Sequence, residues 1–108
     1  MLRFHRDAAG DPRAHADKGR KLLAQWLESD MQGSAASGRK VLAAIDKVAA
    51  GTLDDWERTG NAYTLSLSPE GAEIEPELDD DAEPLHLPLA ELREAIVRWV
   101  EFLEGEER

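Results

Sequence analysis

Apolar and polar side chains alternate with a period of two from residue 62 to residue 78, and this is the clearest pattern in the chain. Such alternation places successive side chains on opposite faces of a β-strand. The stretch 68–71, Ser-Pro-Glu-Gly, interrupts it with a proline at the second position of a turn. The pattern therefore predicts a β-hairpin with one buried face and one solvent face. Its inward positions are Tyr63, Leu65, Leu67, Ala72, Ile74, Pro76 and Leu78.

The solvent face of the second predicted strand is acidic, and an acidic run follows it. Pro76 lies within this strand and has no backbone N–H to donate to a neighbouring strand. We therefore expect the strand at an edge of the sheet. The acidic positions of this segment are Glu73, Glu75, Glu77, Asp79, Asp80 and Asp81.

Apolar residues recur every three to four positions in three other segments, 17–30, 37–50 and 88–104. That period predicts amphipathic helices. Asp17 is suited to cap the first helix, and Pro88 fits the first turn of the third. The predicted buried stripes are Leu22, Leu23, Trp26 and Leu27, then Val41, Ile45, Val48 and Ala49, then Leu89, Leu92, Ile96, Val100 and Leu103.

Two further segments predict strands. Residues 2–6 and 13–16 alternate on either side of a stretch rich in turn-forming residues, which predicts an N-terminal hairpin. Residues 85–87 are long enough for a short fifth strand in the sheet. The order ββααββ(β)α indicates an α+β fold, with an antiparallel sheet built from two β-hairpins and covered by about three helices. At 108 residues the chain forms a single domain, 1–108.

The stretch Thr52–Asp55 has the spacing of a helix capping box, with aspartate in place of glutamate. We therefore expect a helical turn around Trp56. Gly60 would end this turn before the central strand begins.

Composition narrows the class of protein. The chain has no cysteine, which excludes disulfides, thiol catalysis and cysteine-ligated zinc. Its net charge is -10, and residues 69–108 hold fourteen acidic residues against three basic ones. This field repels nucleic acid and anionic membranes and attracts a basic protein surface. The alternative is a solvated face that serves only solubility, and the sequence leaves both interpretations open. The chain has no apolar stretch long enough for a membrane span and no signal-peptide pattern, so we expect a cytoplasmic protein.

The residues that carry chemistry form no recognised catalytic motif. The N-terminal hairpin would bring His5 and His15 together, with Asp7 or Asp11 within reach of a metal ion. The spacing of these residues matches no known metal motif, so we predict no metal or cofactor. The chain has neither a G-x-S-x-G serine nor a phosphate-binding glycine loop, and we predict that it is not an enzyme.

Several spacings coincide with those of a known family. The matching positions are Phe4, Arg6, Asp7, Gly10, Gly19, Trp26, Trp56, Arg58, Gly60, Tyr63, Thr64 and Leu65. In this set the chain resembles the YacL family, small acidic bacterial proteins of uncharacterised function, although its acidic connection before Leu85 is shorter. The resemblance implies a bacterial, cytoplasmic α+β protein and provides no catalytic residues to transfer.

The resemblance also suggests that the segment 55–65 is a structural junction. Trp56 would pack in the core, and Gly60 would supply a backbone angle that other residues avoid. An arginine would hold Asp7, Glu57 or a carbonyl group where the N-terminal hairpin meets this segment. The residues of the predicted junction are Arg6, Asp7, Trp56, Arg58, Gly60 and Tyr63.

These observations favour a non-enzymatic protein-binding module whose acidic C-terminal half contacts a basic partner. One alternative is an immunity-type inhibitor that masks a cationic nuclease toxin. A second alternative is a small-ligand binder or enzyme with a site near His5, Arg6 and Arg58. The sequence leaves open whether the protein is a monomer or a homodimer.

Overall fold

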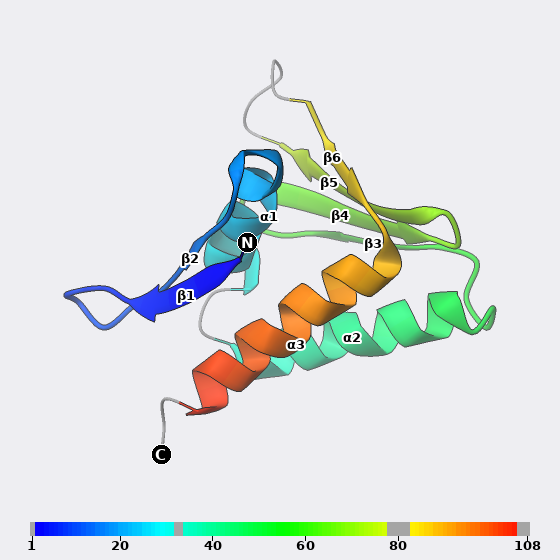
Figure 1. The fold of residues 1–108 in the computed structure, drawn as a ribbon. Coiled ribbons are helices and arrows are strands. Elements are labelled where there is room, and N and C mark those ends of the chain that lie inside the picture. Colours follow the sequence, from blue (N-terminus) through cyan, green and yellow to red (C-terminus); the bar gives the residue numbers. More distant parts are fainter. Residues whose placement is uncertain (1, 32–33, 78–82, 106–108) are drawn as a thin grey trace.

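A computed structural model describes residues 2–31, 34–77 and 83–105, and it confirms the α+β class. Two strands come first, then the helical segments up to α2, then four strands and a final helix (Figure 1). The strands are β1 (Arg3–Arg6), β2 (Pro12–His15), β3 (Trp56–Thr59), β4 (Tyr63–Ser68), β5 (Gly71–Pro76) and β6 (Leu85–Leu87). The helical elements are η1 (Lys18–Arg20), α1 (Lys21–Trp26), η2 (Leu27–Met31), α2 (Ala35–Ala49) and α3 (Leu89–Gly105).

The N-terminal hairpin is present, but it forms a sheet of its own. β1 and β2 pair in antiparallel register, and the other four strands form a separate sheet in the order β3-β4-β5-β6. Asp7 organises the hairpin turn, because its Oδ1 accepts the backbone N–H groups of Ala9 and Asp11 at 3.0 Å each. The prediction that one sheet contains both hairpins is therefore wrong.

The first predicted helix consists of three different helical segments. η1 is a 3₁₀ turn, α1 is α-helical and η2 is a π-helical segment. Asp17 precedes η1 with an extended backbone, and its side chain makes no capping hydrogen bond to this turn. π-Helical segments are rare and often lie at special positions in a fold, and this one contacts the N-terminal hairpin and the loop between β3 and β4, as described below.

α2 and α3 agree closely with their sequence patterns. Ser34 caps α2 by accepting the Ser37 N–H at 3.1 Å, and Gly51 follows the helix with a φ of 80°. Ala49 is exposed, so its predicted place in the buried stripe is wrong. The Pro88 carbonyl accepts backbone N–H groups from the first turn of α3.

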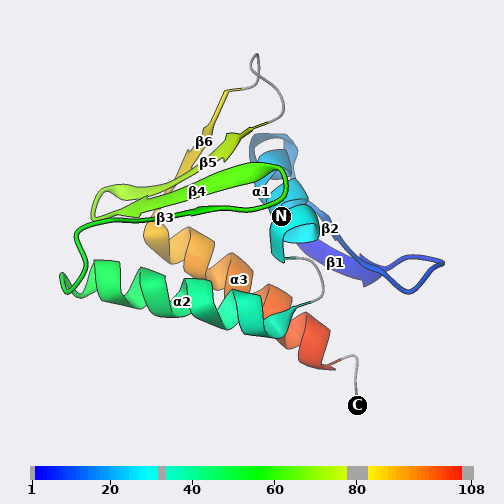
Figure 2. The same ribbon diagram turned by 180° about the vertical axis from the view of Figure 1, so that it is seen from behind.

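α2 and α3 lie side by side and cover one face of the four-stranded sheet (Figures 1 and 2). Gly38 allows their close approach, because a Cβ at this position would lie 2.6 Å from Val100 Cγ2. The largest fully buried side chains come from both helices, from α1 and from the sheet. They include Trp26, Leu27, Met31, Ile45, Leu65, Leu67, Ile74, Leu92, Ile96 and Trp99.

β3 corrects the expectation of a helical turn around Trp56. Trp56–Thr59 pairs with residues 64–67 of β4 in antiparallel register. Aromatic and β-branched residues fit a pleated, half-buried surface, and β4 supplies the partner for a strand here. Leu85–Leu87 forms the short strand predicted there. It is β6 and not the fifth strand, because the unpredicted β3 precedes it.

β5 is an interior strand, so its predicted place at an edge is wrong. β6 pairs with residues 72–74 of β5 and leaves Glu75 and Pro76 beyond it. Pro76 pairs with Tyr63 at the end of the strand, where its missing N–H faces no partner in β6. The edges of the described sheet are β3 and β6.

The hairpin is held against α3 by aromatic contacts. The Phe4 ring meets the buried Trp99 ring edge-on, with centroids 5.0 Å apart, and lies 5.6 Å from the Phe102 ring. The guanidinium of Arg98 lies over Phe4, and that of Arg6 over Phe102. These contacts fix one face of the hairpin and leave the other face toward solvent.

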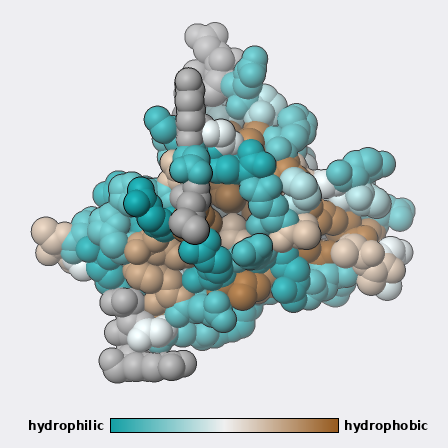
Figure 3. All heavy atoms as spheres, viewed as in Figure 1, coloured by the Kyte–Doolittle hydropathy of each residue, from teal (hydrophilic) through white to brown (hydrophobic). Residues whose placement is uncertain are grey.

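Hydrophilic side chains cover most of the face shown in Figure 3, and hydrophobic ones reach its surface in limited areas between them. None of the helices in the described part of the chain is both long enough and apolar enough to cross a membrane.

Candidate functional site

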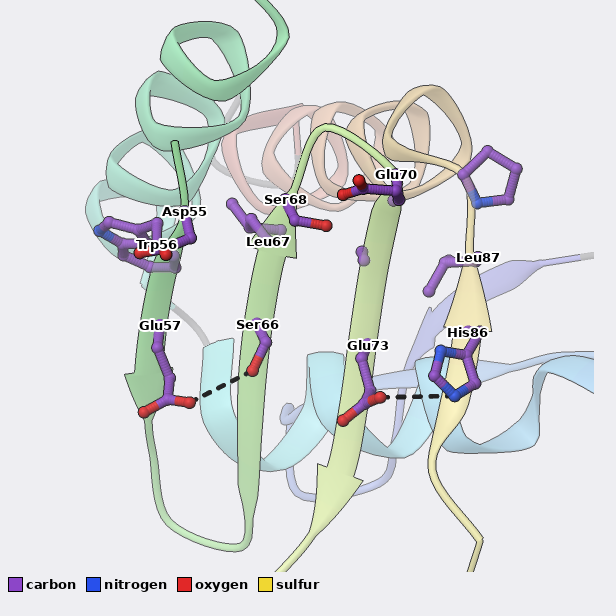
Figure 4. A pocket seen from close by; sticks show the side chains of 13 residues that line it. Asp55, Trp56, Glu57, Ser66, Leu67, Ser68, Glu70, Glu73, His86 and Leu87 are labelled. Carbon is purple, nitrogen blue, oxygen red and sulfur yellow. Dashed lines mark hydrogen bonds and ion pairs between the residues drawn. The ribbon is translucent and has the colours of Figure 1, made fainter. Parts of the chain in front are cut away.

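The face of the four-stranded sheet that points away from α2 and α3 carries a row of polar side chains. Strand register places Glu57, Ser66, Glu73 and His86 opposite one another on β3, β4, β5 and β6. Figure 4 shows these four side chains next to one another on neighbouring strands. We call this surface the outer sheet face.

A shallow trough of about 870 Å³ crosses the outer sheet face. Its lining comes from β3–β6 and the segments that adjoin them, including Asp55 and Glu70. Ser66 lies between Glu57 and Glu73 on the neighbouring strands, and its short side chain leaves room between the longer carboxylates (Figure 4). The lining therefore combines carboxylates with apolar side chains such as Trp56 and Leu87.

Two contacts organise the row. Ser66 Oγ donates to Glu57 Oε2 at 3.4 Å, and His86 Nε2 lies 3.4 Å from Glu73 Oε1. Both pairs leave carboxylate oxygens able to accept further hydrogen bonds. The row can therefore accept cationic donors along its length.

Four of the described arginines form ion pairs with carboxylates elsewhere in the fold. Between described residues, each arginine–carboxylate ion pair lies away from the outer sheet face. Arginine and carboxylate face each other in the pairs Arg13–Asp7, Arg13–Glu28, Arg20–Glu91, Arg39–Glu104 and Arg93–Asp46. None of these four guanidinium groups therefore pairs with a carboxylate of the outer sheet face.

The structure brings part of the predicted partner-binding set onto this face. Glu73 and Glu75 project from β5, and Glu77 follows it and accepts a hydrogen bond from Thr64 Oγ1. The remaining predicted residues, Asp79, Asp80 and Asp81, lie outside the described residues.

Sequence reasoning missed the other members of the row. The predicted helical turn around Trp56 includes Glu57, and it conflicts with the strand pattern that Glu57 forms with Trp56 and Arg58. The sequence predicts a short strand at residues 85–87 but gives no sign that His86 lies beside Glu73. The period-two pattern of residues 56–59 was the signal that could have placed Glu57 beside Glu73.

The segment 55–65 makes other contacts than those predicted for a structural junction. Gly60 is not among the described glycines with positive φ, which are Gly10, Gly51 and Gly71. A Cβ at Gly60 would instead collide with the Asp30 carboxylate. Gly60 is therefore needed for close approach rather than for an unusual backbone angle.

The π-helical segment η2 is the centre of this junction. Glu28 Oε2 accepts the Ala14 N–H at 2.6 Å and Arg13 Nε at 3.1 Å, which attaches η2 to the hairpin. Asp30 Oδ1 accepts the Ala62 N–H at 3.2 Å, and the Ser29 carbonyl accepts Asn61 Nδ2 at 2.8 Å. Consecutive residues of η2 therefore bind the N-terminal hairpin and the loop between β3 and β4.

The other predicted junction residues lie apart from η2. Arg6 donates to the Gly10 carbonyl at 2.9 Å within its own turn, and Asp7 belongs to that turn as well. Trp56 and Arg58 are half-buried on β3, so Trp56 packs against the core without being enclosed by it. The expectation that Arg6 and Asp7 contact this segment is replaced by the contacts of η2.

A second cleft, of about 610 Å³, lies at the junction between β2, the first helical region and the start of β4. Tyr63 donates to Gln25 Oε1 at 3.2 Å on its wall. Burial raises the pKa of the Tyr63 hydroxyl, and the negative charges of Asp30 and Glu28 add to this effect. The hydroxyl therefore stays protonated and serves as a hydrogen-bond donor.

The alternative site near His5, Arg6 and Arg58 is divided between two sheets. His5 stacks on His15, and Arg6 lies over Phe102. Arg58 belongs to β3 and pairs in register with the buried Leu65. The described structure therefore provides no contact among these three residues that would favour a shared site.

Comparison with known proteins identifies relatives. The sequence model of an uncharacterised protein family, UPF0231, matches residues 2–86. The chain is 32% identical over 99 residues to a UPF0231 protein of Shewanella sp. strain MR-4, which covers 78% of this chain and 80% of the relative. It is 31% identical to a UPF0231 protein of Shewanella sp. strain ANA-3, with the same coverage, and 30% identical to one of Shewanella amazonensis. No solved structure matches the chain. The chain therefore belongs to UPF0231, which is the YacL family of uncharacterised bacterial proteins that the sequence spacings indicated.

Proposed function

We propose that this protein is a non-enzymatic binding module whose outer sheet face docks on the basic surface of a partner protein. One observation carries the proposal. The carboxylates of this face border an open trough, and the four described arginines that form ion pairs with carboxylates, Arg13, Arg20, Arg39 and Arg93, form them elsewhere. A surface of this kind gives both orientation and a fast association rate toward a cationic partner.

The shape of the trough suits a lysine or arginine side chain from the partner. Glu57 and Glu73 lie on either side of Ser66, two strands apart, which is a separation of about 10 Å between their backbones. A guanidinium or ammonium group above Ser66 can reach both carboxylates. Charge-assisted hydrogen bonds of this type are stronger than neutral ones.

The arrangement of the row supports a binding role rather than a hydrolytic one. Ser66 donates to Glu57, and β5 lies between Ser66 and His86. Nucleophilic catalysis by serine requires a base within hydrogen-bond reach of the hydroxyl. The proposal includes a cytoplasmic location. It also excludes nucleic acid and membranes as partners, because the acidic face repels their negative charge.

Affinity capture with two charge-matched variants tests this function. The variant E73Q/E75Q removes two charges from the outer sheet face, and E94Q/E101Q removes two from exposed positions of α3. We expect a basic partner that binds the wild type and E94Q/E101Q at low salt and is released as salt rises. E73Q/E75Q should lose most of that binding.

Equal capture by both variants would contradict the proposal, since the total charge and not the outer sheet face would then determine binding. Capture that persists unchanged at high salt would contradict it as well. Thermal unfolding of both variants at the wild-type temperature would exclude a loss of fold as the cause.

A further inference from the structure

We propose that His5 and His15 form a binding site for a borderline divalent cation such as Zn²⁺, Ni²⁺ or Cu²⁺. The site lies on the solvent face of the N-terminal hairpin and does not depend on the function proposed above. The two imidazole rings are nearly parallel, with an interplanar angle of 7° and centroids 4.8 Å apart. In the proposed site the protein provides two ligands, one imidazole nitrogen from each histidine.

The hairpin fixes the backbone under both histidines. His5 pairs in register with Arg13, and His15 with Arg3, so the two histidines occupy diagonal positions on one face. The opposite face is anchored, because Phe4 packs against Trp99 and the neighbouring strand is held by Glu28. A site built on a fixed backbone loses little conformational freedom when an ion binds.

The two side chains themselves are free to adjust. Both histidines are exposed, so no packing prevents rotation of the rings from the stacked arrangement toward a shared ion. Neutral imidazole is a preferred ligand of zinc, nickel and copper, whereas magnesium and calcium prefer oxygen ligands. The two imidazoles would chelate the ion, and solvent molecules would occupy its remaining coordination positions.

Two arginines flank the pair, since Arg13 lies opposite His5 and Arg3 opposite His15. The guanidinium of Arg13 lies 3.1 Å from Glu28 Oε2 and 3.6 Å from Asp7 Oδ2, and Arg3 interacts electrostatically with the Asp17 carboxylate, so carboxylates accompany both positive charges. Asp7 uses its carboxylate in the hairpin turn, and Asp11 lines the junction cleft. The site therefore rests on the two imidazoles and not on the hairpin carboxylates.

Calorimetric titration of the untagged protein with ZnCl₂, NiCl₂ and MgCl₂ tests the site. We expect one Zn²⁺ or Ni²⁺ per chain and no binding of Mg²⁺. His5→Ala and His15→Ala should each weaken the affinity by at least about tenfold, because either change removes the chelate. His86→Ala is the matched control, since it removes an exposed strand histidine outside the pair, and it should leave the affinity unchanged.

In the wild type, substoichiometric Ni²⁺ should broaden the ring NMR signals of His5 and His15 together and spare those of His86. Equal affinity in the wild type and either single variant, or an equal loss in His86→Ala, would overturn the proposal. The NMR experiment decides the question even if a variant folds poorly.

Discussion

The Asp30 carboxylate occupies the space that a side chain at position 60 would need. Its Oδ2 is the atom nearest to the position of a Cβ on Gly60, and its Oδ1 accepts the Ala62 N–H. The loop between β3 and β4 therefore wraps around a carboxylate from η2. Among the described residues, Oδ2 is buried without a hydrogen-bond partner.

Gly60→Ala should destabilise the protein by about 1–3 kcal/mol, the usual cost of overpacking a fixed site. The added methyl group would push the Asp30 carboxylate away from the Ala62 N–H. Urea unfolding of the wild type and the variant measures the change. Gly19→Ala is the control, because a Cβ there meets nothing within 4 Å, and we expect an effect below about 0.5 kcal/mol. Equal stability of Gly60→Ala and the wild type would show that the contact is not tight.

Glu28→Ala should cost about 1–3 kcal/mol, because it leaves the Ala14 N–H without its acceptor beside a buried side chain. Amide hydrogen exchange should accelerate at Ala14 in this variant. Glu104→Ala removes the acidic partner of Arg39 at an exposed position, and it should cost less than about 1 kcal/mol. Unchanged exchange at Ala14 would disprove the role of Glu28 in attaching the hairpin.

Gly38→Ala should destabilise the wild type, although alanine is the better helix former by about 1 kcal/mol. The new methyl group would lie 2.6 Å from Val100 Cγ2, so α2 and α3 would have to separate. In a Val100→Ala background the space is free, and the same change should stabilise the protein. Chemical unfolding of the four proteins measures both effects, and the same sign in both backgrounds would contradict this account.

Glu91 should make stability depend on acid pH. Hydrogen bonds from Arg20 hold the pKa of the Glu91 carboxyl below its ordinary value of 4.5. A lowered folded-state pKa favours folding above the ordinary value, and this contribution is lost as the pH falls through the folded-state pKa. Glu91→Gln should therefore be less stable than the wild type at pH 7, and the difference should shrink toward pH 3.

Arg20→Gln is the reciprocal variant of that experiment. It removes the donor, so it should reproduce the pH dependence of Glu91→Gln. A stability difference that stays constant from pH 7 to pH 3 in either variant would refute the coupling.

Much of the candidate site could be predicted from alternation alone. Tyr63, Leu65 and Leu67 indicated a central strand, and Glu73 and Glu75 indicated the acidic face of its neighbour. The positions of Glu57 and His86 in the row could not be predicted from their own segments. Glu57 pairs with Ser66, 9 residues away, and His86 with Glu73, 13 residues away, so both positions depend on the register between strands.

The sequence by itself determined the class of the fold, the extents of α2 and α3 and the acidity of one strand face. These follow from the period of apolar residues, which each segment carries in its own side chains. Only the tertiary structure decided that residues 56–59 form a strand, that β5 lies inside its sheet and that Gly60 faces Asp30. Each of these depends on a partner distant in the chain, and a contact between distant segments forms only when the whole chain brings them together.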